Sequence, residues 1–210
     1  MYKLSYFKEN NADVVIDFMK QHPFAMLIGV DAENKPVATQ VPVLLKEKEG
    51  VMFLQGHMMK QTDHHKALEN NKNVLVVFSG AHTYVSASVY ENKQQASTWN
   101  YMSVHAKGEM TFLNDEQLLQ MLHELTTHFE NNENSPASYK HLPQEYVHRL
   151  SKAIIAFEIK VDSIDNVFKL SQNKDEKTFN NIVSNLQTGD AEQNIIAAEM
   201  QKRKDEIFKK

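Results

Sequence analysis

The sequence contains no cysteine and few arginines, and both shortages narrow what the protein can do. Without thiols, the chain forms no disulfides, thiolate-bound zinc sites, iron–sulfur clusters or thiol nucleophiles. Arg149 and Arg203 are the two arginines among 23 basic residues, which is poor material for bidentate recognition of guanine. The formal net charge of -4 also provides no overall positive field that would attract nucleic acid.

Long apolar runs are missing as well. No stretch approaches the roughly 20 apolar residues of a transmembrane helix, and residues 1–10 lack the apolar core of a signal peptide. We therefore expect a cytoplasmic protein that makes no contact with a membrane. The 210 residues, 41% hydrophobic and 24% charged, are enough to form one domain of ordinary size with an appendage.

Hydrophobic periodicity predicts a chain of strands with helices between them. Strands are expected at residues 24–30, 37–45, 51–55, 74–78, 82–88, 97–113 and 153–161. Helices are expected at residues 11–21, 60–71, from a cap at Asn114 to Phe129, and at 143–152, 176–186 and 191–208. Because the connections are mostly local and antiparallel, the pattern predicts an α+β fold built on a small antiparallel β-barrel.

Four strands carry more specific predictions. The first three strands, joined by short polar turns, predict an antiparallel meander. Pro42 lies within the second of them, and because proline cannot donate to a ladder, it indicates an edge, a bulge or a ligand site. Residues 74–78 form a nearly continuous β-branched run, which is typical of a strand buried on both faces.

The character of the chain changes at Asn173, so we predict a barrel domain over 1–172 and a helical extension over 173–210. The two helices of the extension flank Gly189 and mimic a helix-turn-helix, but acidic and basic residues balance at seven each. Since a module that clamps phosphates is basic, we expect the extension to pack on the barrel or on a dimer. Its apolar stripes are Ile182, Val183 and Leu186, and Ile195, Ile196 and Met200.

The densest polar cluster is residues 55–66, which follow a strand and open a helix. A helix N-terminus presents unpaired N–H groups, and Lys60 and Lys66 add positive charge, so this segment predicts a phosphate cradle. The alternative is an ordinary solvated loop. A metal site on His57, His64 and His65 is disfavoured, because adjacent histidines on a helix diverge and no pair of ligands is spaced by four.

A second cluster, residues 97–105, contains the single tryptophan. Strand alternation places Trp99, Tyr101, Ser103 and His105 on one face, where the rings could stack on a flat heteroaromatic ligand. Spacing alone favours the alternative, an aromatic face packed in the core. A third cluster, residues 169–173, either caps the helix that follows or contributes to a ligand pocket; the local sequence favours the cap.

Together these segments resemble a known family. The ordered motifs are Ala38-Thr39-Gln40-Val41-Pro42, Gly56-His57-Met58-Met59-Lys60, Val77-Phe78-Ser79-Gly80, Ser86-Ala87-Ser88-Val89-Tyr90, Thr98-Trp99-Asn100-Tyr101 with Val104-His105, and Lys169-Leu170-Ser171-Gln172-Asn173. They occur in the same order in PaiB-type proteins, and the resemblance extends from Met1 to about Leu186.

The resemblance implies an FMN-binding split β-barrel, similar in fold to pyridoxamine phosphate oxidases, that forms a homodimer with flavin at the subunit interface. PaiB-type proteins are described as negative transcriptional regulators, which implies DNA or a regulatory protein as a partner. Carried over to this sequence, the expected cofactor-binding residues are Thr39, Gln40, Val41, His57, Lys60, Thr62, Lys66, Trp99, Asn100, His105, Ser171 and Gln172.

The loop departs from the family pattern, in which arginine is common at Lys60, asparagine at Thr62, proline at Asp63 and tryptophan at His65. The negative charge of Asp63 works against phosphate binding. Two alternatives therefore stay open beside the regulator. One is an FMN-dependent oxidoreductase of the flavin reductase or pyridoxamine phosphate oxidase type, with His105 or Tyr101 as proton donor. The other is a dimer with a degenerate flavin site and an interaction role.

Overall fold

The computed structural model describes residues 1–2, 4–132 and 134–209, which form two compact units. The barrel unit comprises Met19–Phe78 and His105–Ile164. The terminal unit comprises Met1–Phe18, Ser79–Val104 and Asp165–Lys210. The predicted boundary near residue 172 is a different division of the chain, and it stays a prediction.

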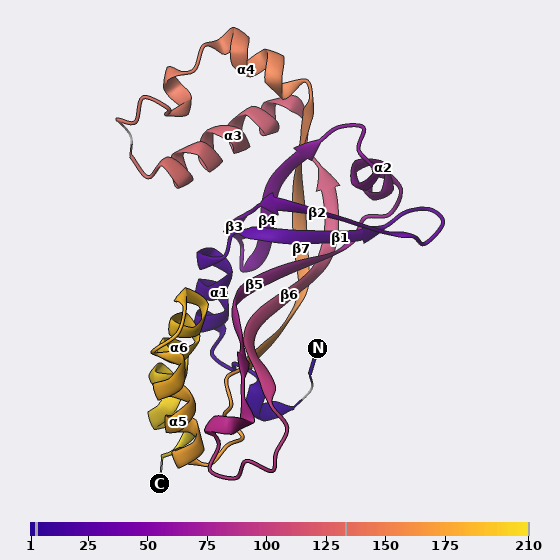
Figure 1. The fold of residues 1–210 in the computed structure, drawn as a ribbon. Helices are drawn as coiled ribbons and strands as arrows, with labels where there is room; N and C mark the ends of the chain where they lie inside the picture. The colour runs from indigo at the N-terminus through magenta and orange to yellow at the C-terminus, as the bar shows by residue number, and fades with distance from the viewer. Residues whose placement is uncertain (3, 133, 210) are drawn as a thin grey trace. The chain divides into compact units, whose positions relative to one another are not determined.

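The described residues form seven strands and six α-helices (Figure 1). The strands are β1 (Phe24–Val30), β2 (Pro36–Pro42), β3 (Leu44–Lys48), β4 (Val51–Met59), β5 (Asn73–Val85), β6 (Thr98–Phe112) and β7 (Ile154–Lys169). The helices are α1 (Ala12–Gln21), α2 (Asp63–Asn70), α3 (Asp115–Glu130), α4 (Gln144–Ser151), α5 (Glu176–Leu186) and α6 (Ala191–Ile207). Short 3-10 turns are η1 (Ser5–Phe7), η2 (Ala87–Val89) and η3 (Tyr139–His141).

The strands form one sheet in the order β2-β1-β5-β6-β7-β4-β3. The described registers, β1 with β2, β1 with β5, β3 with β4 and β4 with β7, are all antiparallel. Val43 alone separates β2 at one edge from β3 at the other, so the sheet must curl until its edges meet. The predicted barrel is confirmed. Both antiparallel pairings of the predicted meander also form, β1 with β2 and β3 with β4, but its second strand, predicted at 37–45, is divided at Val43, so its two parts lie at opposite edges of the sheet.

Alternation of burial separates the inside of the barrel unit from its outer face. On β5, Val74, Val76 and Phe78 are buried, whereas Leu75 and Val77 are only half-buried. The prediction that this run is buried on both faces is therefore wrong for the single chain. Pro42, by contrast, lies on an edge strand as expected, because β2 ends the sheet.

Two glycines allow the strands of the barrel to approach closely. A Cβ at Gly56 would lie 2.8 Å from the ring of Phe157 and 2.9 Å from the carbonyl oxygen of Pro42. A Cβ at Gly108 would lie 2.1 Å from the carbonyl oxygen of Lys160. Gly56 is thus required by packing between strands of this chain.

Helix α3 begins at the cap predicted at Asn114, which forms a capping box with Gln117: each side chain accepts the backbone N–H of the other residue. Its buried Leu118 and Met121 pack on Ala156 of β7. The helix therefore covers part of the outer face of the barrel, on the side of β4 and β7.

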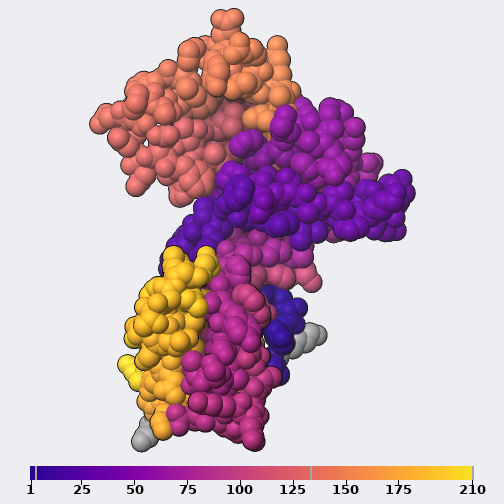
Figure 2. All heavy atoms as spheres, in the orientation of Figure 1, coloured from indigo at the N-terminus to yellow at the C-terminus, as the bar shows by residue number. Residues whose placement is uncertain are grey.

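In the terminal unit, α5 and α6 pack on each other and on the 79–104 segment (Figure 2). Helix α5 buries Ile182, Val183 and Leu186, the stripe predicted for it. On α6, Ile196 and Met200 are buried, but Ile195 is 49% exposed and does not belong to the stripe.

Candidate functional site

The loop between β4 and α2 forms much as the sequence predicts, although α2 begins three residues later than expected. Thr62 caps the helix: its hydroxyl accepts the backbone N–H of His65 at 3.3 Å and donates to the carbonyl of Met59 at 3.0 Å. This hydroxyl is therefore used by the helix itself, and it is not a free donor for a ligand.

Asp63 takes a second donor of the same helix. Its carboxylate accepts the backbone N–H of His64 at 2.8 Å and lies 3.1 Å from the Nδ1 atom of that ring. These hydrogen bonds lower the pKa of Asp63, so its negative charge persists at neutral pH beside the helix N-terminus. With the N–H groups of His64 and His65 occupied, the helix start is a weaker anion site than the sequence suggests.

The ammonium groups of Lys60 and Lys66 remain available to bind an anion. Lys60 is half-buried, Lys66 is exposed, and neither forms an ion pair with any residue that the structure describes. Two unpaired ammonium groups flanking one loop attract an anion without help from the helix dipole. The fit to a phosphate therefore rests on these two lysines.

His57 lies on the outer face of β4, in register with Ala156, against which α3 packs. Its Nδ1 atom is buried and has no hydrogen-bond partner among the described residues. Burial lowers the pKa of the His57 imidazole, so the ring is neutral at pH 7. A buried, unsatisfied ring nitrogen is a group that a bound ligand could satisfy.

His65 is a packing residue in this structure. It is 4% exposed, its ring lies 5.1 Å from that of Phe112, and its Nδ1 accepts the backbone N–H of Gln61 at 3.4 Å. In the described part of the chain, no three potential ligands among histidine, aspartate and glutamate converge as a metal site.

The remaining expected ligands of the barrel unit differ in their placement. Thr39 and Gln40 are half-buried and exposed, respectively, whereas Val41 is 5% exposed and belongs to the core. Gln40 shares the outer face with Met26, its partner on β1. His105 on β6 is half-buried.

The other four expected ligands lie in the terminal unit. Trp99 is 53% exposed and stands beside His82 and Tyr84, with ring centroids 6.0 Å and 5.9 Å away. Its indole is therefore on the surface of this chain, which argues against the core-packing alternative.

Asn100, Ser171 and Gln172 use their polar groups within the chain. The Asn100 side chain is fully buried, accepts the hydroxyl of Ser171 at 3.0 Å and donates to the Met200 sulfur at 3.5 Å. The Gln172 side chain accepts the backbone N–H of Leu170 at 2.7 Å, and its amide nitrogen donates to the Phe168 carbonyl at 2.5 Å. The cap predicted from residues 169–173 is wrong, because Asp175 itself caps α5.

Sequence reasoning missed a polar cavity beneath α3 that contains Lys46, Lys48 and Glu158. The sequence did contain one indication of it: Lys46 and Lys48 are two residues apart on one strand, which places both side chains on the same face. Their carboxylate partners come from distant segments, so no local pattern indicates them.

Known proteins share this chain's sequence and fold. Residues 1–163 match a family described as "Putative FMN-binding domain". The chain is 30% identical over 210 residues to "Protease synthase and sporulation protein PAI 2" of Bacillus subtilis, covering 100% of this chain and 99% of that protein.

Two solved structures show the fold. The FAD and heme binding protein of Mycobacterium smegmatis has a TM-score of 0.55 at 16% identity, covering 78% of this chain and 73% of that one. The flavocytochrome Anf3 of Azotobacter vinelandii has a TM-score of 0.56 at 14% identity, covering 80% and 72%. With these matches the resemblance and the split-barrel fold are confirmed: the chain belongs to the PaiB-type family of FMN-binding domains, and FMN is the cofactor that this membership indicates.

Proposed function

We propose that this protein is a cytoplasmic, homodimeric, FMN-binding negative regulator of transcription. The observation that carries the proposal is the match to the Bacillus subtilis protein, which extends over both chains almost completely. That protein is named for protease synthesis and sporulation, and the proposal carries a regulatory role in such processes over to this chain. A match over the whole length supports the same arrangement of flavin domain and C-terminal helices.

The residues of the barrel unit fit FMN in their charge and hydrogen-bonding capacity. Lys60 and Lys66 would hold the phosphate, and the unsatisfied Nδ1 atom of His57 would accept a hydrogen bond from the ligand. Bound flavin supplies redox chemistry that side chains lack. The chain's own groups bind and orient it.

The C-terminal helices support regulation through a partner protein or a metabolite over direct reading of DNA. Their basic side chains are engaged with acidic ones: Lys177 with Glu91, Lys202 and Arg203 with Glu199, and Lys204 with Glu176. Arg203 also lies 3.5 Å from Glu9. Little positive charge is left to neutralise phosphates of DNA.

An FMN-dependent oxidoreductase is the second candidate, and the half-buried phenol of Tyr101 on β6 favours it as a hydrogen-bond donor to a bound flavin or substrate. Burial and the neighbouring Tyr2 raise the pKa of Tyr101, so the phenol stays protonated at neutral pH but is a weaker acid than an ordinary tyrosine. No residue that the structure describes identifies a substrate.

A gene deletion complemented with variants tests the proposal. If the FMN-bound protein represses transcription, the transcripts of the genes it regulates should rise in the deletion strain. The wild-type gene should lower them again. The double variant K60A/K66A should fail to do so, whereas K93A, which removes an exposed lysine of the terminal unit, should succeed.

Other outcomes separate the alternatives. Equal repression by the double variant would show that flavin is not needed and would favour the degenerate site. Unchanged transcripts, together with FMN-dependent oxidation of reduced nicotinamide by the purified protein, would favour the oxidoreductase. A monomer in light scattering at micromolar concentration would contradict the proposed dimer.

A further inference from the structure

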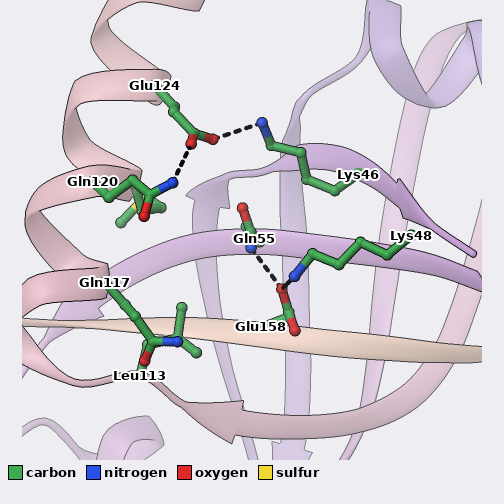
Figure 3. Close-up of a pocket in the computed structure, with 9 residues that line it drawn as sticks. Lys46, Lys48, Gln55, Leu113, Gln117, Gln120, Glu124 and Glu158 are labelled. Atoms are coloured by element: carbon green, nitrogen blue, oxygen red, sulfur yellow. Dashed lines mark hydrogen bonds and ion pairs between the residues drawn. The ribbon is translucent and has the colours of Figure 1, made fainter.

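A cavity of about 230 Å³ lies in the barrel unit between α3 and the outer face of β3, β4 and β7 (Figure 3). Pockets for drug-sized ligands span roughly 300–1,000 Å³, so this one is suited to a small metabolite. Leu113 and Met121 are its apolar wall residues, and the rest of its lining is charged or amide-bearing.

Two ion pairs line the cavity, and in each pair the lysine and the glutamate come from different elements. Lys46 and Lys48, both on β3, extend to Glu124 on α3 and Glu158 on β7, each with a nitrogen–oxygen distance of 2.6 Å (Figure 3). The lining thus has two positive and two negative groups. A purely anionic ligand would face both carboxylates, and a purely cationic ligand would face both ammonium groups.

A bound ligand can replace the partners within these ion pairs. The side chains of Lys46 and Glu124 are 36% and 31% exposed, and solvent screens an ion pair of this kind strongly. The hydrogen bond from Lys46 is the main reason why the pKa of Glu124 is lowered, so the carboxylate is charged and ready to accept an ammonium group.

Three glutamines leave part of their amides unused among the described residues. The Gln55 and Gln120 side chains donate to Glu158 at 2.6 Å and to Glu124 at 3.0 Å, which leaves both amide oxygens as acceptors. The Gln117 oxygen accepts the backbone N–H of Asn114, which leaves its amide nitrogen as a donor. A ligand with a polar side chain would find partners of both kinds.

We propose that this cavity binds a zwitterionic α-amino acid, whose carboxylate takes the β3 lysines and whose ammonium group takes Glu124 and Glu158. Such a ligand adds one charge of each sign, so the lining and the ligand together stay electrically neutral. The proposal does not rest on flavin binding, because none of the residues expected to hold FMN lines the cavity.

The first test is calorimetric titration of the full-length protein with each of the twenty common L-α-amino acids, with and without saturating FMN. We expect one or more polar amino acids to bind. The N-acetyl and the carboxamide derivatives of each hit should bind at least about tenfold more weakly, since each lacks one of the two charges. No binding by any amino acid, or equal binding by the derivatives, would overturn the proposal.

Variants then locate the site. The double variants K46Q/E124Q and K48Q/E158Q each neutralise a pair without leaving a lone charge, and each should weaken binding at least about tenfold. The matched control is K35Q/E33Q, a pair on an exposed turn 3.8 Å apart. Circular dichroism verifies that each variant is folded, and unchanged affinity in both cavity variants would place the ligand elsewhere.

Discussion

The polar residues of the family motifs differ between the two units in whether other residues of the chain already bond them. In the barrel unit, Lys60 and Lys66 are unpaired and a ring nitrogen of His57 is unsatisfied. In the terminal unit, Asn100 and Ser171 are bonded to each other and buried. The two sets look alike in the sequence, but only the first offers groups to a ligand, whereas the second holds strands and helix together.

The largest expected effect is on stability and comes from Asn100. Replacing it with alanine leaves the Ser171 hydroxyl buried without its acceptor, and should lower the free energy of unfolding by about 2–3 kcal/mol. Urea denaturation measures this, and Q94A, at an exposed position, should cost less than about 0.5 kcal/mol. Full stability with loss of FMN binding would instead move Asn100 into the ligand-binding set.

Lys60 and Lys66 should show the reverse behaviour. Replacing either with alanine should weaken FMN binding by about 1.5–3 kcal/mol if the contact is direct, and should leave stability nearly unchanged. Fluorescence titration of FMN measures the affinity, with K93A as the control. Wild-type affinity in both single variants would mean that the phosphate is held elsewhere.

His57 should make stability depend on pH. Because burial depresses its pKa in the folded state, the unfolded state binds a proton first as the pH falls. Its contribution to stability is therefore complete above the ordinary histidine pKa of about 6.5 and is lost progressively below it. Denaturation at several values between pH 7.5 and 5.5 should show a smaller loss for H57Q than for wild type. H148Q, at an exposed histidine, should behave like wild type, and a parallel pH profile for H57Q would refute the assignment.

Asp63 should give the smallest effect. Its carboxylate is fully exposed, so D63N should strengthen FMN binding only severalfold at low ionic strength, and added salt should shrink the gain. Titrations at two salt concentrations measure this difference. Weaker binding by D63N would show that the hydrogen bonds of Asp63 with His64 matter more than its charge.

Local patterns predicted the local structure well. The cap at Asn114 and the full extent of β1 and α5 were all readable, because each depends on residues within one turn or one strand. The family was readable for a similar reason, since its motifs are short and keep their order.

What the sequence determined by itself is therefore most of the inventory: the helices, most of the strands, the cap at Asn114 and the flavin-binding family. The tertiary structure decided how the barrel closes at Val43 and which polar groups stay free. Asn100 and Ser171 are 71 residues apart, and Lys48 and Glu158 are 110 apart. Whether a polar side chain is hydrogen-bonded within the chain or remains available to a ligand depends on such distant partners, and no local periodicity encodes them.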